Sequence, residues 1–313
     1  MSNIQHRVFN DGFAIWFDGT SQSFEFDVHI NEWINEKSNF IDIGLRIYNT
    51  NQISKGYIYV PFSLSNNDIV DLSHHLSSEK IARGLFNTAC AINVPIDSSL
   101  IQLSYNNRTE DIIPLKLLSP QINSLDNKTL IQLSFDTVHP KLCNQETYLR
   151  FRFPHKSMNQ CFVLSKHDYK IIFESPIIKD KINHTLKINE FRSLPDDIRH
   201  TLTKTTQKIN KTILTVSATQ EYIIDDSTCY KIRHLENDLF LDYVPSIFSC
   251  DNAIIYQWIT SNKKRYNFNT KIEIQKISRE SMLMYAGMII FLSFIGNILW
   301  KLLTFIPCFN WLQ

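Results

Sequence analysis

The stretch FEFDVHI, residues 24–30, alternates strictly between apolar and polar side chains. Its four apolar residues fall on one face of an extended chain, and its polar residues fall on the other: Glu25, Asp27 and His29. This is the pattern of an antiparallel strand with one face in a hydrophobic core and one face toward solvent.

Similar short runs recur along the chain, separated by turn material rich in Asn, Asp and Ser. We expect strands at residues 24–30, 40–48, 56–64, 99–105, 129–135, 148–153, 169–174, 211–217, 228–233, 239–244, 253–259 and 271–277. Many short strands at regular spacing predict a mainly β protein, made of one or two antiparallel β-sandwich-like units with two short helices. We assign a β-rich region to residues 1–165 and a second β-rich unit of the same body to residues 166–277.

Two stretches have helical character. One lies within residues 67–90. The other is LPDDIRHTLTKTTQKI, residues 194–209, where Ser193 is the expected cap, Pro195 lies in the first turn and Lys208 lies near the other end.

A single C-terminal transmembrane helix is expected over residues 281–305, followed by a short tail over residues 306–313. Met282 to Trp300 contains no charged residue. A helix that crosses the hydrocarbon core of a bilayer needs about 20 mainly apolar residues.

This expected span carries a polar stripe. At 100° per residue, Ser293, Asn297, Lys301 and Thr304 fall within a sector of about 80°. Asn at membrane depth is costly unless it meets another helix or water, so the stripe predicts a homo-oligomer of spans or a water-filled pore. The alternative is that Lys301 marks the far interface and snorkels to it.

Basic residues precede the charge-free run from Met282 to Trp300, and only Lys301 follows that run. Because basic flanks stay on the cytoplasmic side, we expect a single-pass protein of the cell inner membrane with the bulk of the chain in the cytoplasm. The N-terminus lacks the features of a secretory signal, and the six scattered cysteines are typical of free thiols in a reducing compartment.

Composition excludes several classes of protein. The net charge is +1, from 32 basic and 31 acidic residues, so no global field favours nucleic acid. No glycine lies between Gly84 and Gly287, which excludes a P-loop or a dinucleotide-binding loop there. No catalytic motif is present, and we expect a protein that is not an enzyme and has no cofactor.

The best candidate ligand site lies in YLRFRFPHK, residues 148–156. Arg150 and Arg152 project from one strand face, with Lys156 beyond them, and two neighbouring guanidiniums can hold adjacent phosphates. The alternative is an ordinary solvent face whose arginines pair with acidic residues of a neighbouring strand.

A second basic cluster consists of Lys263, Lys264 and Arg265, next to Tyr266 and Phe268. Its charges and rings suit single-stranded nucleic acid. Close to a bilayer, however, they are better explained by contact with phospholipid headgroups.

Asp71 and His75 have the i, i+4 spacing of a helical zinc-ligand pair. A surface pair without metal is the alternative, because no third ligand is evident.

A cytoplasmic, β-rich, non-enzymatic domain with one C-terminal span resembles the membrane effectors of prokaryotic anti-phage systems, most of all the effectors of the Hailong system. The resemblance is one of architecture, and YLRFRFP (148–154) and INEFRSLPDDI (188–198) are the segments to compare. It implies abortive infection through the membrane, with spans restrained by a DNA oligomer or nucleotide that a partner nucleotidyltransferase makes. The near-neutral charge departs from that of an oligonucleotide binder.

The expected function is therefore that of a membrane effector. Its β-rich domain would sense a ligand or partner and control oligomerised spans that disrupt the inner membrane or form a pore in it. The alternative is a tail-anchored scaffold that recruits a cytoplasmic partner to the membrane.

Overall fold

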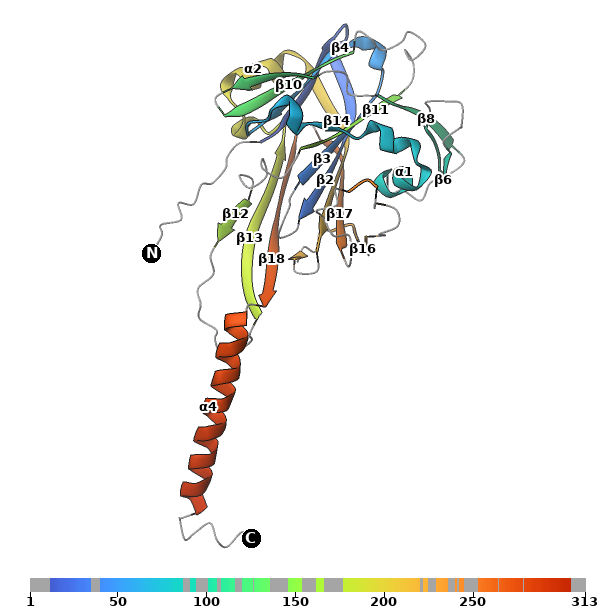
Figure 1. Cartoon of the computed structure of the whole chain (residues 1–313). Coiled ribbons are helices and arrows are strands. Elements are labelled where there is room, and N and C mark those ends of the chain that lie inside the picture. Colours follow the sequence, from blue (N-terminus) through green and yellow to red (C-terminus); the bar gives the residue numbers. More distant parts are fainter. Residues whose placement is uncertain are drawn as a thin grey trace.

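The computed structural model forms a β-rich body from which one long helix projects (Figure 1). It describes residues 12–34, 40–86, 91–93, 101–105, 108–115, 120–125, 127–135, 146–153, 162–165, 177–219, 222–224, 229–235, 240, 242–244, 253–263, 265–277 and 279–304.

The largest layer is a ten-stranded sheet in the order β16-β17-β14-β2-β3-β11-β8-β7-β6, with β5 paired to β11. Its strands are β2 (Ser23–Ile34), β3 (Phe40–Ile47), β5 (Val70–Asp71), β6 (Ala91–Asn93), β7 (Ile101–Tyr105), β8 (Arg108–Pro114), β11 (Glu146–Phe153), β14 (Thr206–Ala218), β16 (Lys231–His234) and β17 (Ile254–Lys263). The pairs β14–β2 and β11–β8 are parallel, and the other pairs are antiparallel.

Two four-stranded antiparallel sheets complete the body, in the orders β1-β4-β10-β9 and β12-β13-β18-β15. Their strands are β1 (Ala14–Gly19), β4 (Ile53–Val60), β9 (Gln121–Leu125), β10 (Lys128–Ser134), β12 (Phe162–Ser165), β13 (Ile177–Ile188), β15 (Tyr222–Ile224) and β18 (Tyr266–Ile277). One face of the large sheet packs on these smaller sheets around a common hydrophobic core, which includes Phe26, Ile58, Phe151 and Leu214. The expected mainly β, sandwich-like fold is confirmed.

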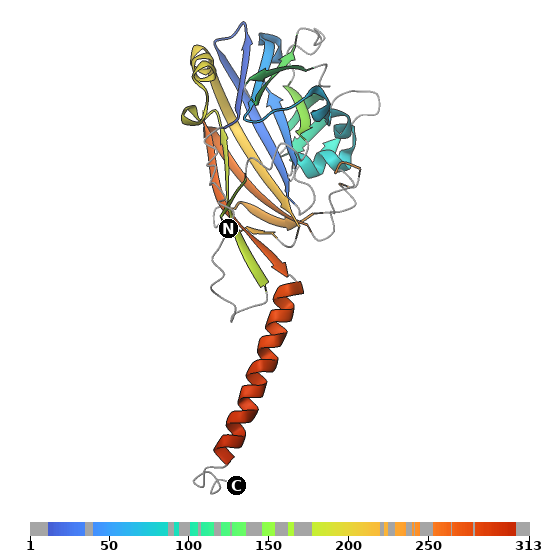
Figure 2. The ribbon, with the colours of Figure 1, turned by 60° about the vertical axis from the view of Figure 1, so that its left-hand side comes forward.

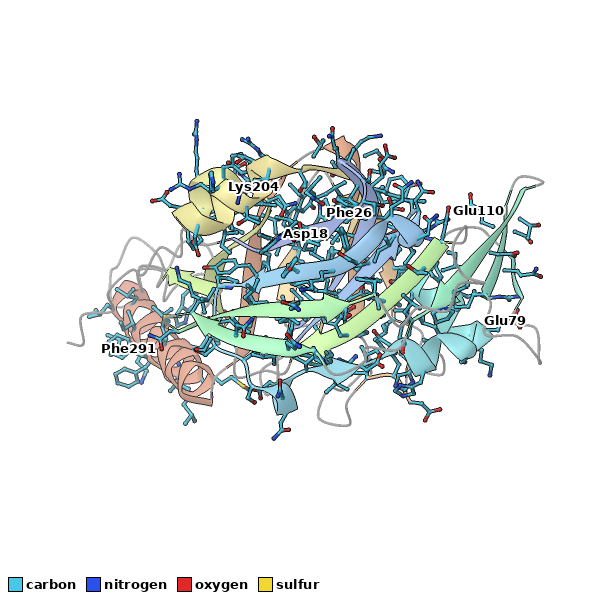
Figure 3. The ribbon with its side chains drawn as sticks, turned by 90° about the horizontal axis from the view of Figure 1, so that it is seen from above. Asp18, Phe26, Glu79, Glu110, Lys204 and Phe291 are labelled. Carbon is cyan, nitrogen blue, oxygen red and sulfur yellow. The ribbon has the colours of Figure 1, made fainter. Side chains whose placement is uncertain are left out.

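The second face of the large sheet is also buried. It is covered by a 3-10 turn, η3 (Ser73–Ser77), by α1 (Glu79–Phe86) and by Phe240, Tyr243 and Val244, which share a second hydrophobic cluster with Trp33 and Phe40. The outer face of the β1 sheet is covered in turn by α2 (Asp196–Lys204). Seen from above, α1 and α2 lie on different sides of the stacked sheets (Figure 3). This second cover buries a strand face that the sequence pattern placed in solvent.

The two sequence regions share these layers. Strands β14, β16 and β17, from residues 166–277, lie in the same sheet as β2, β3 and β11, from residues 1–165. Residue 165 therefore does not separate two sheets.

One expected strand differs in the structure, one cannot be compared, and the first expected helix is present within its expected range. The described residues of the strand expected at 239–244 form a turn instead, in which the amides of Tyr243 and Val244 both donate to the carbonyl oxygen of Phe240. The run expected at 169–174 lies outside the described residues. The first helix, α1, begins at Glu79, after the 3-10 turn.

The second expected helix is shorter than its sequence pattern indicated. Helix α2 ends at Lys204, and Thr206 begins β14. There the side-chain oxygen of Gln207 accepts from the amide of Phe17 in β1, and its side-chain nitrogen donates to the carbonyl oxygen of Phe17. Ser193 is not the cap. Its hydroxyl donates to the carbonyl oxygen of Glu190 at 2.8 Å, and Pro195 occupies the cap position.

The C-terminal helix, α4 (Arg279–Thr304), follows β18 after one residue and points away from the body (Figures 1 and 2). At a rise of 1.5 Å per residue its 26 residues span about 39 Å. The stretch Tyr285–Leu302 is long and apolar enough to cross a membrane, and none of it is buried against the body. A C-terminal helix of the expected length and apolar composition is confirmed, and its insertion into a membrane stays a prediction.

Candidate functional site

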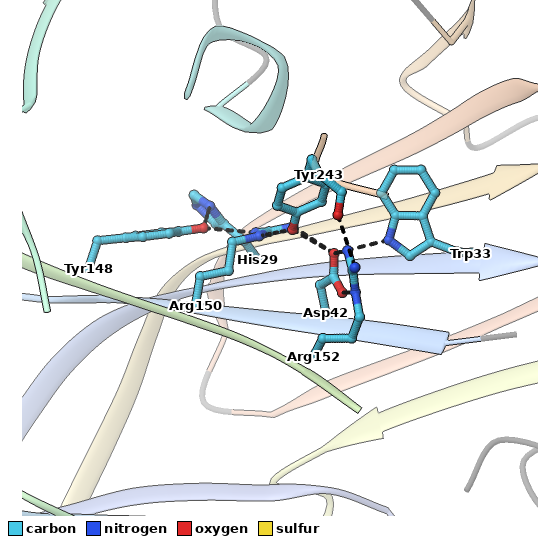
Figure 4. A network of polar contacts seen from close by, with 7 residues as sticks. All are labelled: His29, Trp33, Asp42, Tyr148, Arg150, Arg152 and Tyr243. Atoms are coloured by element: carbon cyan, nitrogen blue, oxygen red, sulfur yellow. Dashed lines mark hydrogen bonds and ion pairs between the residues drawn. The ribbon is translucent and has the colours of Figure 1, made fainter. Parts of the chain in front are cut away.

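A buried polar network lies on the second face of the large sheet (Figure 4). It is built from β2, β3 and β11, whose register places His29 beside Gly44 and Gly44 beside Arg150. Two residues further along each strand, the next row on the same face consists of Asn31, Asp42 and Arg152. The strand alternation that sends Ile41, Ile43 and Phe151 into the sandwich core therefore sends these polar groups to the opposite side.

Asp42 is the centre of this network and has no exposed surface. Nε and Nη2 of Arg152 donate to its two carboxylate oxygens at 2.7 and 3.1 Å. The Tyr243 hydroxyl and the Trp33 indole both donate to Oδ2, at 2.6 and 3.0 Å. Burial alone would raise the pKa of Asp42, but the charge and hydrogen bonds of Arg152, with the charge of Arg150, hold that pKa below its ordinary value.

Arg150 joins the two halves of the network. Its Nε donates to the Tyr243 hydroxyl at 2.5 Å, its Nη1 donates to the Tyr148 hydroxyl at 3.0 Å, and its Nη2 lies 3.6 Å from Oδ2 of Asp42. Arg152 adds a hydrogen bond from Nη1 to the carbonyl oxygen of Tyr243 at 3.0 Å. Both guanidiniums therefore hold Tyr243 and its turn on the sheet.

His29 ends the chain of hydrogen bonds on the other side. Its Nδ1 lies 3.0 Å from the Tyr148 hydroxyl oxygen. Burial, reinforced by the charge of Arg150, lowers the pKa of His29 well below its usual value, so the ring is neutral. Arginine can only donate, so the Tyr148 oxygen accepts from Arg150 and its proton is free to be donated to Nδ1.

Gly44 makes room for this arrangement. A Cβ added at Gly44 would lie 2.1 Å from the Tyr148 hydroxyl oxygen and 3.0 Å from Nη1 of Arg150. The absence of a side chain in the middle of β3 thus lets one phenol bridge His29 and Arg150 across the strand.

A second, half-buried polar cluster adjoins the first. Arg46, on the same face of β3, donates from Nε to Glu146 at 2.7 Å and also pairs with Glu110. Nearby, the Tyr48 hydroxyl donates to Asp27 at 2.8 Å. Burial raises the pKa values of both Asp27 and Glu146. The buried network has two guanidiniums for one carboxylate, whereas this cluster has three carboxyl groups for one guanidinium, so the two have opposite excess charge.

The sequence correctly placed Arg150 and Arg152 on one strand face. The alternative reading is right about their pairing with an acidic residue of a neighbouring strand, Asp42 of β3, but the face is buried and not exposed to solvent. The two residues are 1% and 6% exposed, and their donors are taken up inside the chain. A phosphate can reach them only if the cover over this face opens. Lys156 lies outside the described residues.

The expected membrane-surface cluster lies far from α4. Arg265 precedes β18, whose 12 residues span about 40 Å before α4 begins. Its guanidinium lies 3.9 Å from the ring centroid of Phe191, near α2. Lys263 ends β17, and Lys264 lies outside the described residues. At this end of the body Arg265 is not beside the bilayer that α4 would cross.

Asp71 and His75 do not share a helix. Asp71 ends β5 and accepts a hydrogen bond from the amide of Ser73 at 2.8 Å, while His75 lies in η3 with its ring 5.4 Å from that of Tyr243. No group of three metal-ligating side chains comes together among the residues that the structure describes.

The polar stripe of α4 is exposed where its side chains are described. Ser293, Asn297 and Lys301 are exposed, and Thr304 is the last residue of the helix. The large apolar side chains around them are exposed as well, among them Phe291, Phe294 and Trp300. Figure 3 shows Phe291 on α4.

Sequence reasoning missed Asp42, Trp33 and Tyr243 as partners of the arginines. The one available signal was Asp42 itself, a carboxylate in the apolar run FIDIGLRI, on the face shared with Arg46. Tyr243 gave no such signal, because its segment matched a strand pattern.

No family model matches this chain, and no curated protein matches it. Among solved structures, the crystal structure of baculovirus P35 is similar at 8% sequence identity and a TM-score of 0.21, over 85% of this chain and 94% of that chain. A similarity this weak carries no argument about fold or function.

Proposed function

We propose that this protein is a single-pass membrane effector whose C-terminal helix assembles with other copies in the bilayer and breaches it, under the control of the β-rich body. The observation that carries the proposal is the surface of α4. Along Tyr285–Leu302 this surface is not buried against the body. It is apolar except for one polar sector, which contains Ser293 and Asn297.

The apolar surface supports insertion into lipid. Eleven of the fourteen exposed large hydrophobic residues in the described part of the chain lie on α4: Met282, Leu283, Ile289, Ile290, Phe291, Leu292, Phe294, Ile298, Leu299, Trp300 and Leu302. An apolar surface of this extent on a soluble protein would aggregate, whereas in a bilayer it is solvated by acyl chains.

The polar sector supports assembly. A helix that serves only as an anchor faces lipid on all sides and gains nothing from Asn297 at depth, where its amide lacks partners. Packing of several copies would give Ser293 and Asn297 either a neighbouring helix or a water-filled lumen, with Lys301 at one end.

The junction between β18 and α4 supports control by the body. All twelve residues of β18 pair with β13, and α4 begins two residues after Ile277. With so short a connection, a rotation or displacement of this strand pair moves the helix directly. The body would then respond to a ligand or protein partner on the cytoplasmic side of a cell inner membrane.

The resemblance to Hailong effectors suggests a DNA oligomer or nucleotide as that ligand. Because Arg150 and Arg152 are engaged with Asp42, Tyr148 and Tyr243, such a ligand would either bind elsewhere or displace Tyr243 from them.

The test is to induce the full-length chain in bacteria, with and without phage challenge, and to measure membrane potential and growth. We expect the unmodified chain to collapse the potential, and a variant carrying Asn297→Leu and Lys301→Leu to reach the membrane equally but leave the potential intact. Ile298→Leu with Leu302→Ile, on the opposite side of α4, is the matched control and should act like the unmodified chain.

A tail-anchored scaffold would give a different pattern. The membrane potential would then stay unchanged in every variant under every trigger, and the polar sector of α4 would serve only to pack helices together.

A further inference from the structure

The edge strand β16 and the residue before it expose apolar side chains that belong neither to the hydrophobic core nor to α4. Tyr230, just before the strand, is 70% exposed, and Ile232 within it is 59% exposed. Apart from these and the residues of α4, Val70 is the remaining large hydrophobic residue that is exposed among the described residues. The two side chains share one face of β16, since they are two residues apart.

The exposure follows from the position of β16 at the edge of the large sheet. Its inner neighbour is β17, where Ile232 pairs with Tyr256. Tyr256 is buried in the sandwich core, whereas Tyr230 and Ile232, one strand further out, are not covered by the smaller sheets.

The charges of this edge are all basic. The stretch CYKIRHL, residues 229–235, contains Lys231, Arg233 and His234 and no acidic residue. Lys231 and His234 are exposed. An apolar and aromatic pair flanked by basic side chains is the composition of a surface that contacts anionic lipid headgroups.

The topology places this edge at the end of the body from which α4 begins. His234 pairs with Ile254 at the start of β17, which runs away to Lys263, and β18 then returns along its twelve residues to Ile277 and α4. Figure 1 shows β16 at the end of the body from which α4 emerges.

We propose that Tyr230, Lys231, Ile232 and His234 form a second membrane contact, on the anionic surface of the bilayer that α4 spans. The inference rests on the proposed insertion of α4. The span holds the body beside the bilayer, so the effective lipid concentration is high and a small contact suffices. A second copy of this chain suits the edge poorly, because two basic edges would repel each other.

The contact would fix the orientation of the body relative to α4. With one tether the body is free to rotate about the β18–α4 junction, whereas a second contact at β16 selects one orientation. The charge of the lipid would thereby influence how the body controls the assembly of the α4 helices.

The experiment places the photoreactive residue p-benzoyl-phenylalanine at Tyr230 in the full-length chain, reconstituted in nanodiscs with tail-labelled lipid. Flotation with liposomes first establishes that the chain is inserted. We expect crosslinks to lipid from position 230 in discs that contain phosphatidylglycerol, and a lower yield in discs of phosphatidylcholine alone. Adding Lys231→Gln should reduce the yield about fivefold, as expected for the loss of one surface lysine contact.

The matched control carries the same probe at Lys204, an exposed residue at the end of α2. It should give no lipid crosslink, since α2 lies at the opposite end of the body (Figure 1). Equal yields at positions 230 and 204, or crosslinks from position 230 to a second copy, overturn the inference while leaving the inserted helix in place. A chain that does not float overturns both this inference and the proposed function.

Discussion

The Tyr243 hydroxyl lies 2.6 Å from Oδ2 of Asp42, and 201 residues separate the two in sequence. The same hydroxyl accepts a hydrogen bond from Arg150 at 2.5 Å. The phenol of Tyr243, in a turn packed on the face of the sheet, thus links a carboxylate of β3 to a guanidinium of β11. Burial raises the pKa of Tyr243, so the group stays protonated and can make both bonds.

Replacing Tyr243 with Phe should destabilise the body by about 1–3 kcal/mol, because Arg150 Nε and one Asp42 lone pair lose their partner in the interior. The free energy of unfolding, from urea titrations of the detergent-solubilised chain followed by tryptophan fluorescence, checks this. Tyr230→Phe, at an exposed position, should change it by less than about 0.5 kcal/mol. Equal effects of the two changes would mean that the buried phenol contributes little.

Asp42→Asn should cost more, about 3–5 kcal/mol, because it leaves two buried guanidiniums without a counter-charge. The double variant with Arg152→Gln should be less destabilised than the sum of the two single variants, by about 0.5–3 kcal/mol of coupling. Asp196→Asn, which breaks an exposed pair with Arg199, is the control and should cost at most about 1 kcal/mol. Strict additivity of the buried pair would contradict the network.

Gly44→Ala should destabilise the body because the added methyl group meets the Tyr148 hydroxyl. Combining it with Tyr148→Phe should recover part of the loss, since the nearest atom is then gone while the ring carbon 2.8 Å away remains. Thermal unfolding of Gly44→Ala, Tyr148→Phe and the double variant measures this. Gly287→Ala in α4 has nothing within 4 Å of the new methyl group and should leave the melting temperature of the body unchanged.

His29 should make stability depend on pH. Its pKa in the folded chain is well below the ordinary value of 6.5, so below about pH 6.5 the unfolded chain takes up a proton that the folded chain does not. Stability should therefore fall as the pH falls, by about 1.4 kcal/mol per pH unit, and should gain nothing from His29 above pH 6.5. The raised pKa values of Asp27 and Glu146 act in the opposite sense at lower pH.

The measurement for His29 is the unfolding free energy between about pH 5 and pH 7 for the unmodified chain and His29→Gln. The variant retains Asp27 and Glu146, so the difference in slope belongs to His29. Parallel curves would show that His29 is protonated in the folded chain.

The local pattern of the sequence was sufficient for several elements. Alternation predicted β2, β3, β10, β11, β14 and β17, because a strand with one face in the sandwich core must place an apolar residue at every second position. The charge-free run from Met282 predicted the helix that became α4, since no other stable structure uses so many consecutive apolar residues without a cover.

The sequence by itself thus determined the β-rich class, the sandwich-facing side of the strands and the long apolar helix at the C-terminal end. Only the tertiary structure decided the environment of Asp27, His29, Asp42, Arg150 and Arg152, which alternation alone assigns to solvent. The physical reason is that alternation records which face meets the first core, whereas burial of the polar face depends on η3, α1 and the turn of Tyr243. These cover the polar face from distant parts of the chain and supply the hydrogen bonds that make its burial tolerable.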